Sequence, residues 1–155
     1  DIRAIPTVTV VALAPLCAGG NNGSIQLAAE GQAPFSFVWA DGTIGPLRPA
    51  LVADTYVARM LGEVTVPLVD PLPIVITPSA TPPTCPGNAG VVCATAAGGT
   101  GGLQFTWDTG AATVDDCSPA EPGSWTVTVV DEQQCTAQAS VVVPSAPITT
   151  ASVQA

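Results

Sequence analysis

Histidine and lysine are both absent from this chain of 155 residues, and its only cations are Arg3, Arg48 and Arg59. Without histidine, the chain has no Ser-His-Asp or Cys-His nucleophile system and no imidazole metal ligand. Without lysine, it has no Schiff-base residue, no P-loop and no lysine isopeptide cross-link. We therefore expect a protein that is not an enzyme and that holds neither a cofactor nor a metal.

Clustered positive charge and long hydrophobic runs are missing as well. The net charge of −9 argues against nucleic acid and anionic membrane surfaces as partners, because neutralising phosphates requires clusters of Lys and Arg. No run reaches the roughly 20 apolar residues that a membrane span needs. The start at Asp1 lacks a basic region followed by an apolar stretch, so we expect any secretory signal to be removed or to lie outside this segment.

The five cysteines are notable in a chain so poor in reactive groups. No two of them are spaced two to four residues apart, so the spacing fits no zinc module. Cysteines of this kind are typical of an oxidising compartment. We expect an extracellular or cell-surface location.

An internal repeat organises the whole chain. Four pairs of residues are each separated by 68 positions, namely Cys17 and Cys85, Phe37 and Phe105, Trp39 and Trp107, and Gly42 and Gly110. Tyr56 and Trp125 are separated by 69 positions. A fixed offset over several residue types indicates tandem copies of a unit of about 70 residues.

Each copy reads as a series of strands, because Val, Ile, Thr and aromatic residues alternate with period two between Gly, Pro and Asn clusters. Six or seven short strands per copy are typical of a β-sandwich. The predicted fold is all-β, with two tandem Ig-like β-sandwich domains. The predicted domains are residues 1–70 and 71–145, followed by a tail at 146–155.

Alternation also predicts the core of each copy. In FSFVW and LQFTW, the residues Phe37 and Trp39, and Phe105 and Trp107, lie on one face of a strand, and a sandwich made mainly of Val and Ala needs bulky anchors there. Tyr56 and Trp125 stand at strand positions that look inward. The competing interpretation of the tryptophans is a platform for stacking sugars.

The copies share an order of residues that runs Cys, Gly-Ser-Ile or Gly-Val-Val, Gly, Trp and Gly, and the second copy continues to GSWTVTVVDEQQC. This order resembles the SprB-type repeat of Bacteroidetes cell-surface gliding and adhesin proteins. The resemblance covers roughly residues 17–68 and 85–143 and is closer in the second copy. There Gln134 stands where Gly is usual, and the first copy lacks the Asp and the terminal Cys. The resemblance implies a stalk or adhesive array at the cell surface.

The cysteines can be partly paired by comparing the copies. Cys93 and Cys117 have counterparts near Gln26 and Arg48 that are not cysteine, so we expect Cys93 and Cys117 to form a disulfide on an outer face. Cys85 and Cys135 are the family-like first and last cysteines and the next pair. Cys17 is then left over, either as a buried thiol or in a disulfide to another subunit or to a part of the molecule outside this segment.

Two weaker sites remain open. The carboxylates Asp115, Asp116, Asp131 and Glu132 stand in turns and could bind Ca²⁺, although solvated turn acids are the simpler interpretation. Asn22 begins an Asn-Gly-Ser glycosylation sequon, which is also typical of a tight turn before a strand.

The tail parallels the segment between the copies, so residues from Pro147 onward, with Ile148 and Val153, resemble the leading strand of a further unit. This strand either continues into a third covalent repeat or pairs with a neighbouring copy, as could the stretch from Ile5 to Leu13. The predicted function is a structural or adhesive part of an extracellular fibre, joined head to tail with copies of itself or with further repeats. A surface glycan or a protein is the possible receptor. The alternative is a carbohydrate-binding module of a secreted protein.

Overall fold

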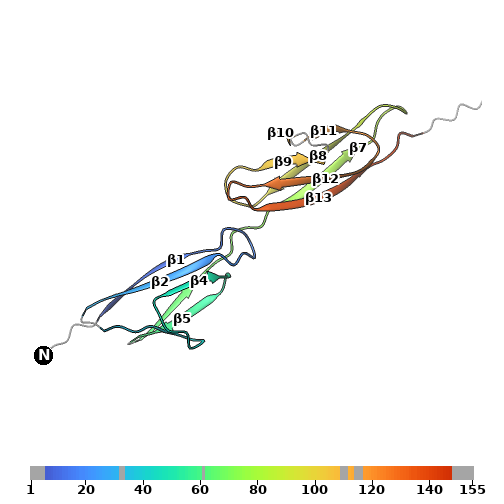
Figure 1. Ribbon diagram of the computed structural model, residues 1–155. Helices are drawn as coiled ribbons and strands as arrows, with labels where there is room; N and C mark the ends of the chain where they lie inside the picture. Colours follow the sequence, from blue (N-terminus) through green and yellow to red (C-terminus); the bar gives the residue numbers. More distant parts are fainter. Residues whose placement is uncertain (1–5, 32–33, 61, 109–111, 114–116, 148–155) are drawn as a thin grey trace, which may run out of the picture. The chain divides into compact units, whose positions relative to one another are not determined.

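The computed structural model describes residues 6–31, 34–60, 62–108, 112–113 and 117–147 (Figure 1). Its regular elements are all strands within these ranges, so the predicted all-β class is confirmed. Among the described residues there is no helix that could span a membrane. The chain divides into two compact units, unit 1 from Asp1 to Leu72 and unit 2 from Pro73 to Ala155.

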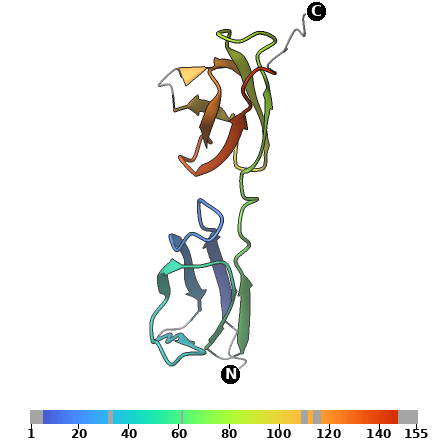
Figure 2. The ribbon, with the colours of Figure 1, turned by 90° about the vertical axis from the view of Figure 1, so that its right-hand side faces the viewer.

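Unit 1 consists of two antiparallel sheets in two layers (Figure 2). Its strands are β1 (Thr7–Leu13), β2 (Gly23–Glu30), β3 (Val38–Trp39), β4 (Leu47–Leu51), β5 (Thr55–Arg59) and β6 (Glu63–Pro67). One sheet has the order β1-β2-β4 and the other has the order β3-β5-β6.

Unit 2 repeats this plan with one additional short strand. Its strands are β7 (Val75–Thr81), β8 (Gly90–Ala97), β9 (Gln104–Trp107), β10 (Ala112–Thr113), β11 (Cys117–Ala120), β12 (Gly123–Val130) and β13 (Thr136–Val143). The sheets have the orders β11-β8-β7 and β10-β9-β12-β13. Six strands in one unit and seven in the other agree with the number that the sequence predicts.

The strand order is that of an immunoglobulin-like sandwich. In such folds strands A, B, E and D form one sheet, and strands C, F and G form the other. The described residues contain the A, B and E strands of the first sheet but no D strand. Unit 1 matches with β1, β2 and β4 against β3, β5 and β6, and unit 2 matches with β10 as an added C′ strand. The topology therefore supports the prediction of tandem Ig-like domains.

In each unit, every second side chain of a strand points inward and fills the space between the two sheets. In β2, Ile25 and Leu27 are fully buried while Gln26 and Ala28 are exposed, and in β8 the buried Val92 and Ala94 flank Cys93. The buried core of unit 1 comprises Ile25, Leu27, Phe37, Trp39, Leu51, Ala58, Val66 and Leu68. The buried core of unit 2 comprises Val92, Ala94, Trp107, Ala120, Val127, Val129 and Val143.

Three strands, β4, β10 and β11, are not predicted by the sequence pattern. β4 and β11 carry Pro49 and Pro119, and β10 has only two residues, so none shows an alternating pattern. β7 extends to Thr81, although Pro78 lies within it. Proline is tolerated in these strands because β4, β7 and β11 are edge strands, where a missing N–H leaves no neighbour unpaired.

Candidate functional site

The two tryptophans that share the repeat offset lie at the centres of the two cores. Trp39 of β3 is 3% exposed and Trp107 of β9 is 1% exposed. Phe37 is buried beside Trp39, and Phe105 is half-buried against the core of unit 2. The predicted role of these residues as core anchors is confirmed, and neither indole ring is presented to solvent as a sugar-stacking face.

The side chain of Arg48 packs over the indole ring of Trp39 in unit 1. Its guanidinium lies 5.2 Å from the centroid of the indole ring, a cation–π distance, and its side chain is 19% exposed. Asp41 holds the guanidinium through two contacts, Nη1 to Oδ1 at 3.0 Å and Nη2 to Oδ2 at 2.9 Å. The indole Nε1 donates to the carbonyl of Gly45 at 2.8 Å. Arg48 therefore covers the aromatic face that a sugar would need.

A shallow pocket of about 170 Å³ lies beside this ion pair and is lined in part by Asp54 and Tyr56. The backbone N–H of Thr43 donates to Asp41, and this bond, more than the nearby Arg48, lowers the pKa of the Asp41 carboxyl. The pocket thus offers both donors and acceptors, but its volume is well below the roughly 300 Å³ at which typical ligand sites begin.

Tyr56 and Trp125 occupy equivalent positions and make equivalent bonds. The hydroxyl of Tyr56 donates to the carbonyl of Val52 at 3.1 Å, and Nε1 of Trp125 donates to the carbonyl of Glu121 at 2.8 Å. Both acceptors lie four residues upstream, which is the arrangement of the tyrosine corner of Ig-like sandwiches. Both side chains are half-buried, so they pack against the core and also fix the corner before β5 or β12.

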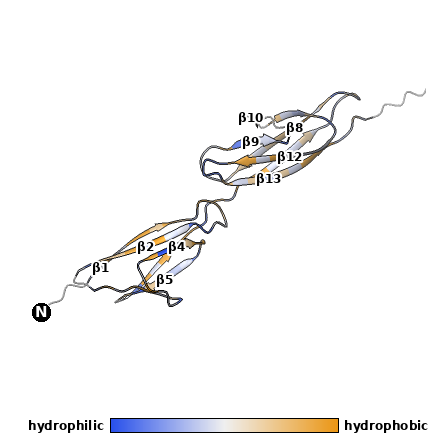
Figure 3. Cartoon of the chain, in the orientation of Figure 1, coloured by the Kyte–Doolittle hydropathy of each residue, from blue (hydrophilic) through white to orange (hydrophobic). Residues whose placement is uncertain are grey.

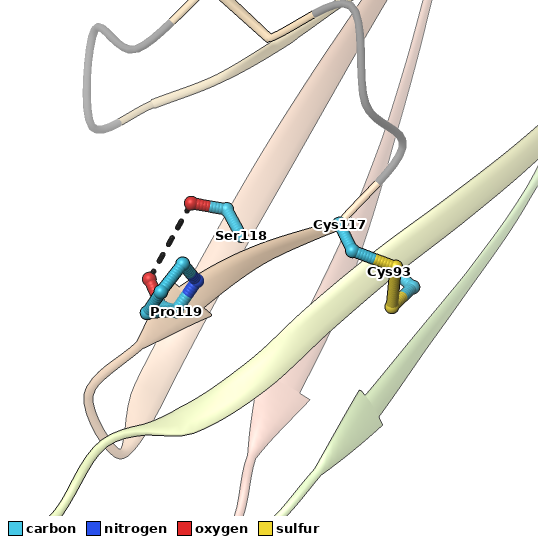
Figure 4. The surroundings of a disulfide bond; sticks show 4 residues. All are labelled: Cys93, Cys117, Ser118 and Pro119. Atoms are coloured by element: carbon cyan, nitrogen blue, oxygen red, sulfur yellow. Dashed lines mark hydrogen bonds between the residues drawn. A yellow bond between two sulfur atoms is a disulfide. The ribbon is translucent and has the colours of Figure 1, made fainter.

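A disulfide joins Cys93 of β8 to Cys117 of β11, as the comparison of copies predicts (Figure 4). The two residues are direct partners in the ladder. At the equivalent place in unit 1, Gln26 is paired with Leu47 and not with Arg48. The predicted counterpart of Cys117 is therefore one residue off, because Arg48 belongs to the alternate face of β4 and turns toward Trp39.

The predicted pairing of Cys85 with Cys135 is wrong. Cys85 is a free, exposed thiol, so it does not pair with Cys135. Cys17 and Cys135 are both disulfide-bonded, which contradicts the interpretation of Cys17 as a buried thiol. The residue without a disulfide is Cys85, in the loop between β7 and β8. The predicted pair follows the order of cysteines in the resembling family, and this order does not encode the pairing.

Asp131 is the one acidic side chain among the described residues that is buried, at 3% exposure. It accepts backbone hydrogen bonds from Thr100 at 2.8 Å, Cys135 at 2.8 Å and Gln133 at 2.9 Å. Burial acts to raise its pKa, but the three N–H donors outweigh burial and the pKa is lowered. Asp131 therefore joins the β12–β13 turn to the loop after β8.

Close approach to Asp131 requires glycine at position 99. Gly99 has a φ of +68°, and a Cβ there would lie 2.9 Å from Ile74 Cγ1 and 3.1 Å from the Asp131 carboxylate. Glu132 accepts from the N–H of Gly102 at 3.0 Å. Asp131 and Glu132, the two carboxylates of this turn that were weighed as calcium ligands, thus both accept hydrogen bonds from backbone groups, and the described residues contain no group of three or more metal-ligating side chains. Asp115 and Asp116 lie outside the described residues.

Asn22 and the tail complete the candidate residues. The side-chain carbonyl of Asn22 accepts the N–H of Leu16 at 2.9 Å, as expected of a turn before β2. Pro147 is exposed after β13, while Ile148 and Val153 of the predicted assembly strand lie outside the described residues.

Residues 14–44 match the family model of the SprB repeat. The match covers β2 and β3 with the loops around them and confirms the resemblance in the first copy. No curated protein matches the chain.

Two solved structures are similar to the chain. The three N-terminal domains of the bacteriophage RB49 Highly Immunogenic Outer Capsid protein (Hoc) are 15% identical, with a TM-score of 0.48 over 91% of this chain and 59% of that one. A structure solved to explain Dscam isoform specificity is 16% identical, with a TM-score of 0.37 over 92% of this chain and 46% of that one. The chain thus spans about half the length of these structures, and its Ig-like topology is established by its own strand order.

Proposed function

We propose that this chain is a structural segment of a cell-surface adhesin built from tandem Ig-like repeats. The observation that carries the proposal is that one strand order occurs twice, with Trp39 and Trp107 buried at the same place in each unit. The SprB match at residues 14–44 adds the link to surface proteins. In this role the tandem sandwiches act as spacers, and a spacer depends on the stability of its units and not on a chemical site.

The side chains best suited to chemistry have structural partners, which supports a protein that is not an enzyme. Arg48 is held by Asp41, Asp131 accepts three backbone bonds, and the indoles of Trp39 and Trp125 donate to carbonyls. The Cys93–Cys117 bond fits an oxidising location outside the cytosol.

Head-to-tail joining is the finer part of the proposal. The sequence from Pro147 onward parallels the sequence from Pro73 onward, and in unit 2 the latter becomes the leading strand β7. In the tail, the same pattern would either lead a third covalent repeat or pair with a neighbouring copy. A truncation ending at Pro144 separates these cases where the full chain assembles by itself. Loss of filaments supports pairing between copies, and normal filaments from the truncated chain rule it out.

Mechanical unfolding of single molecules tests the spacer function. We expect a separate unfolding event for each sandwich, because each unit has its own core. In a chain that carries Cys17→Ser and Cys135→Ser, reduction of the Cys93–Cys117 bond should release an additional contour length of about 8 nm from unit 2, since this bond encloses a sequence separation of 24 residues at about 3.4 Å each. A chain that extends without resistance would contradict a structural role.

Glycan binding is the alternative function, and the pocket beside Arg48 and Asp54 is where it would occur. A glycan array probed with the full chain tests it, with Asp54→Ala as the matched variant. We expect no binding by either chain, because Arg48 covers the face of Trp39. Binding that Asp54→Ala abolishes would favour a carbohydrate-binding module over a spacer.

A further inference from the structure

The outer edge of β1 is an unpaired strand edge in unit 1. All seven residues of β1, Thr7–Leu13, pair with β2 on one side. No other strand of the described chain pairs with β1 on its other side. The backbone N–H and C=O groups along that edge are therefore available to a further strand.

The other edge strands carry features that prevent such pairing. Proteins protect strand edges with proline, charge, short length or a neighbouring element. β3 and β10 have two residues each, β4, β7 and β11 contain proline, β6 contains Glu63 and Pro67, and β13 lies against β7. β1 has none of these features, since its sequence TVTVVAL is free of proline, glycine and charge.

β1 is also more exposed than its equivalent in unit 2. In β7, exposed and half-buried residues alternate, and Ile76 and Ala80 pack on the core. In β1, only Val8 is half-buried, while Val11 and Leu13 are 60% and 61% exposed. The second half of β1 is coloured as hydrophobic in Figure 3, so an apolar strand borders the open edge.

Charge favours β1 as the place where two copies of the chain can meet. The net charge of −9 makes contacts between copies unfavourable wherever acidic residues face each other. β1 itself is neutral, and the nearest acidic side chain on its partner strand, Glu30, stands opposite Thr7 at one end of the ladder. In a two-fold arrangement the two Glu30 residues lie at opposite ends, so no carboxylates oppose each other.

We propose that two copies of this chain associate laterally by antiparallel pairing of β1 with β1, centred on Val10. This register places Thr7 opposite Leu13 and Thr9 opposite Val11 of the other copy, pairs all seven residues and leaves Pro6 outside the ladder. The proposed occupant is a second copy, because antiparallel pairing of β1 with β1 covers the unpaired β1 edge of both copies at once. Pairing with any other strand would leave the β1 edge of the second copy unpaired. The pairing extends β1-β2-β4 into one sheet across two copies. It does not depend on the adhesin function proposed above.

Covalent trapping tests the register. In a chain whose exposed thiol is removed by Cys85→Ser, Val10→Cys places two new thiols opposite each other across the two-fold axis, within the reach of a disulfide. Leu13→Cys is the matched control, because its opposite residue is Thr7. With oxidised glutathione as the oxidant, we expect disulfide dimers from Val10→Cys and few from Leu13→Cys. Equal amounts from both variants, or none from either, would overturn the register.

Sedimentation over a range of concentrations tests the association itself. Val11→Lys adds two unpaired charges to each pair of copies at an exposed position, so it should weaken the dimer at least about tenfold without unfolding unit 1. Ser79→Lys is the matched control at the equivalent position of β7 and should leave the dimer unchanged. A wild-type chain that stays monomeric at millimolar concentration, or a dimer unaffected by Val11→Lys, would refute the proposal.

Discussion

In unit 1 the indole N–H of Trp39 donates to Gly45, and Arg48 lies over the ring, whereas the N–H of Trp107 in unit 2 has no acceptor among the described residues. Unit 2 is held together by different contacts. Cys93 and Cys117 connect β8 to β11, and Asp131 connects the β12–β13 turn to the loop after β8. One strand order is therefore compatible with two sets of closing interactions, because the sheets depend on burial of one large side chain and not on any single polar contact.

The two units also differ in how their edges are covered. The hairpin of β12 and β13 has eight residues in each strand, and β13 lies against β7. The hairpin of β5 and β6 has five residues in each strand, and the edge of β1 is unpaired. The longer hairpin therefore accompanies the covered edge, and the shorter one accompanies the strand that we propose as a contact between copies.

Removal of the shared tryptophan should have the largest effect. Trp107→Ala should lower the free energy of unfolding of unit 2 by about 3–5 kcal/mol, because it leaves a cavity at a side chain that is 1% exposed. Trp39→Ala should have an effect in the same range on unit 1. Urea unfolding with hydrogen exchange resolved by strand measures both. An unchanged melting temperature would contradict the core role.

The disulfide can be transferred to the other unit. Gln26→Cys with Leu47→Cys places cysteines at the ladder pair equivalent to Cys93 and Cys117, and closing this loop should stabilise unit 1 by up to about 3 kcal/mol. The chain should also carry Cys85→Ser to remove the competing thiol. The reference is Gln26→Ser with Leu47→Ser, compared by calorimetry. Failure of the bond to form in non-reducing peptide maps would show that the two ladders are not equivalent.

The corner bonds should contribute less. Tyr56→Phe removes the hydroxyl that donates to Val52 and keeps the ring, so it should destabilise unit 1 by about 1 kcal/mol or less, as expected for one hydrogen bond near solvent. Faster hydrogen exchange at the start of β5 measures the loss. An effect spread evenly over unit 1 would point to packing and not to the corner.

The hydrogen bonds that Asp131 accepts should make the stability of unit 2 depend on pH. Its pKa is lowered from 3.8 in the folded chain, so its stabilising effect is present above pH 3.8 and is lost as the pH falls through the folded value. Asp131→Asn should therefore be less stable than wild type at neutral pH and should approach it at lower pH. Thermal melting between pH 2 and 7 measures this. A constant difference over that range would contradict the role of the carboxylate charge.

Much of the fold follows from the sequence alone. The offset of 68 between residues such as Trp39 and Trp107 predicts the two units, and alternation predicts that both indoles face the core. These features are local, because side-chain direction in a strand reverses at every residue whatever the rest of the chain does. The Cys93–Cys117 bond was also predictable, since both cysteines are exceptions to the same repeat.

Only the tertiary structure decided the features that depend on which distant segments meet. It placed Leu47 and not Arg48 opposite Gln26, left Cys85 as the free thiol, buried Asp131 against Thr100, and left one edge of β1 unpaired. β4 and β11 were missed because proline interrupts their alternation, and they are strands only because β2 and β8 pair with them. Register and edge exposure are relations between strands far apart in sequence, and no local pattern of residues encodes them.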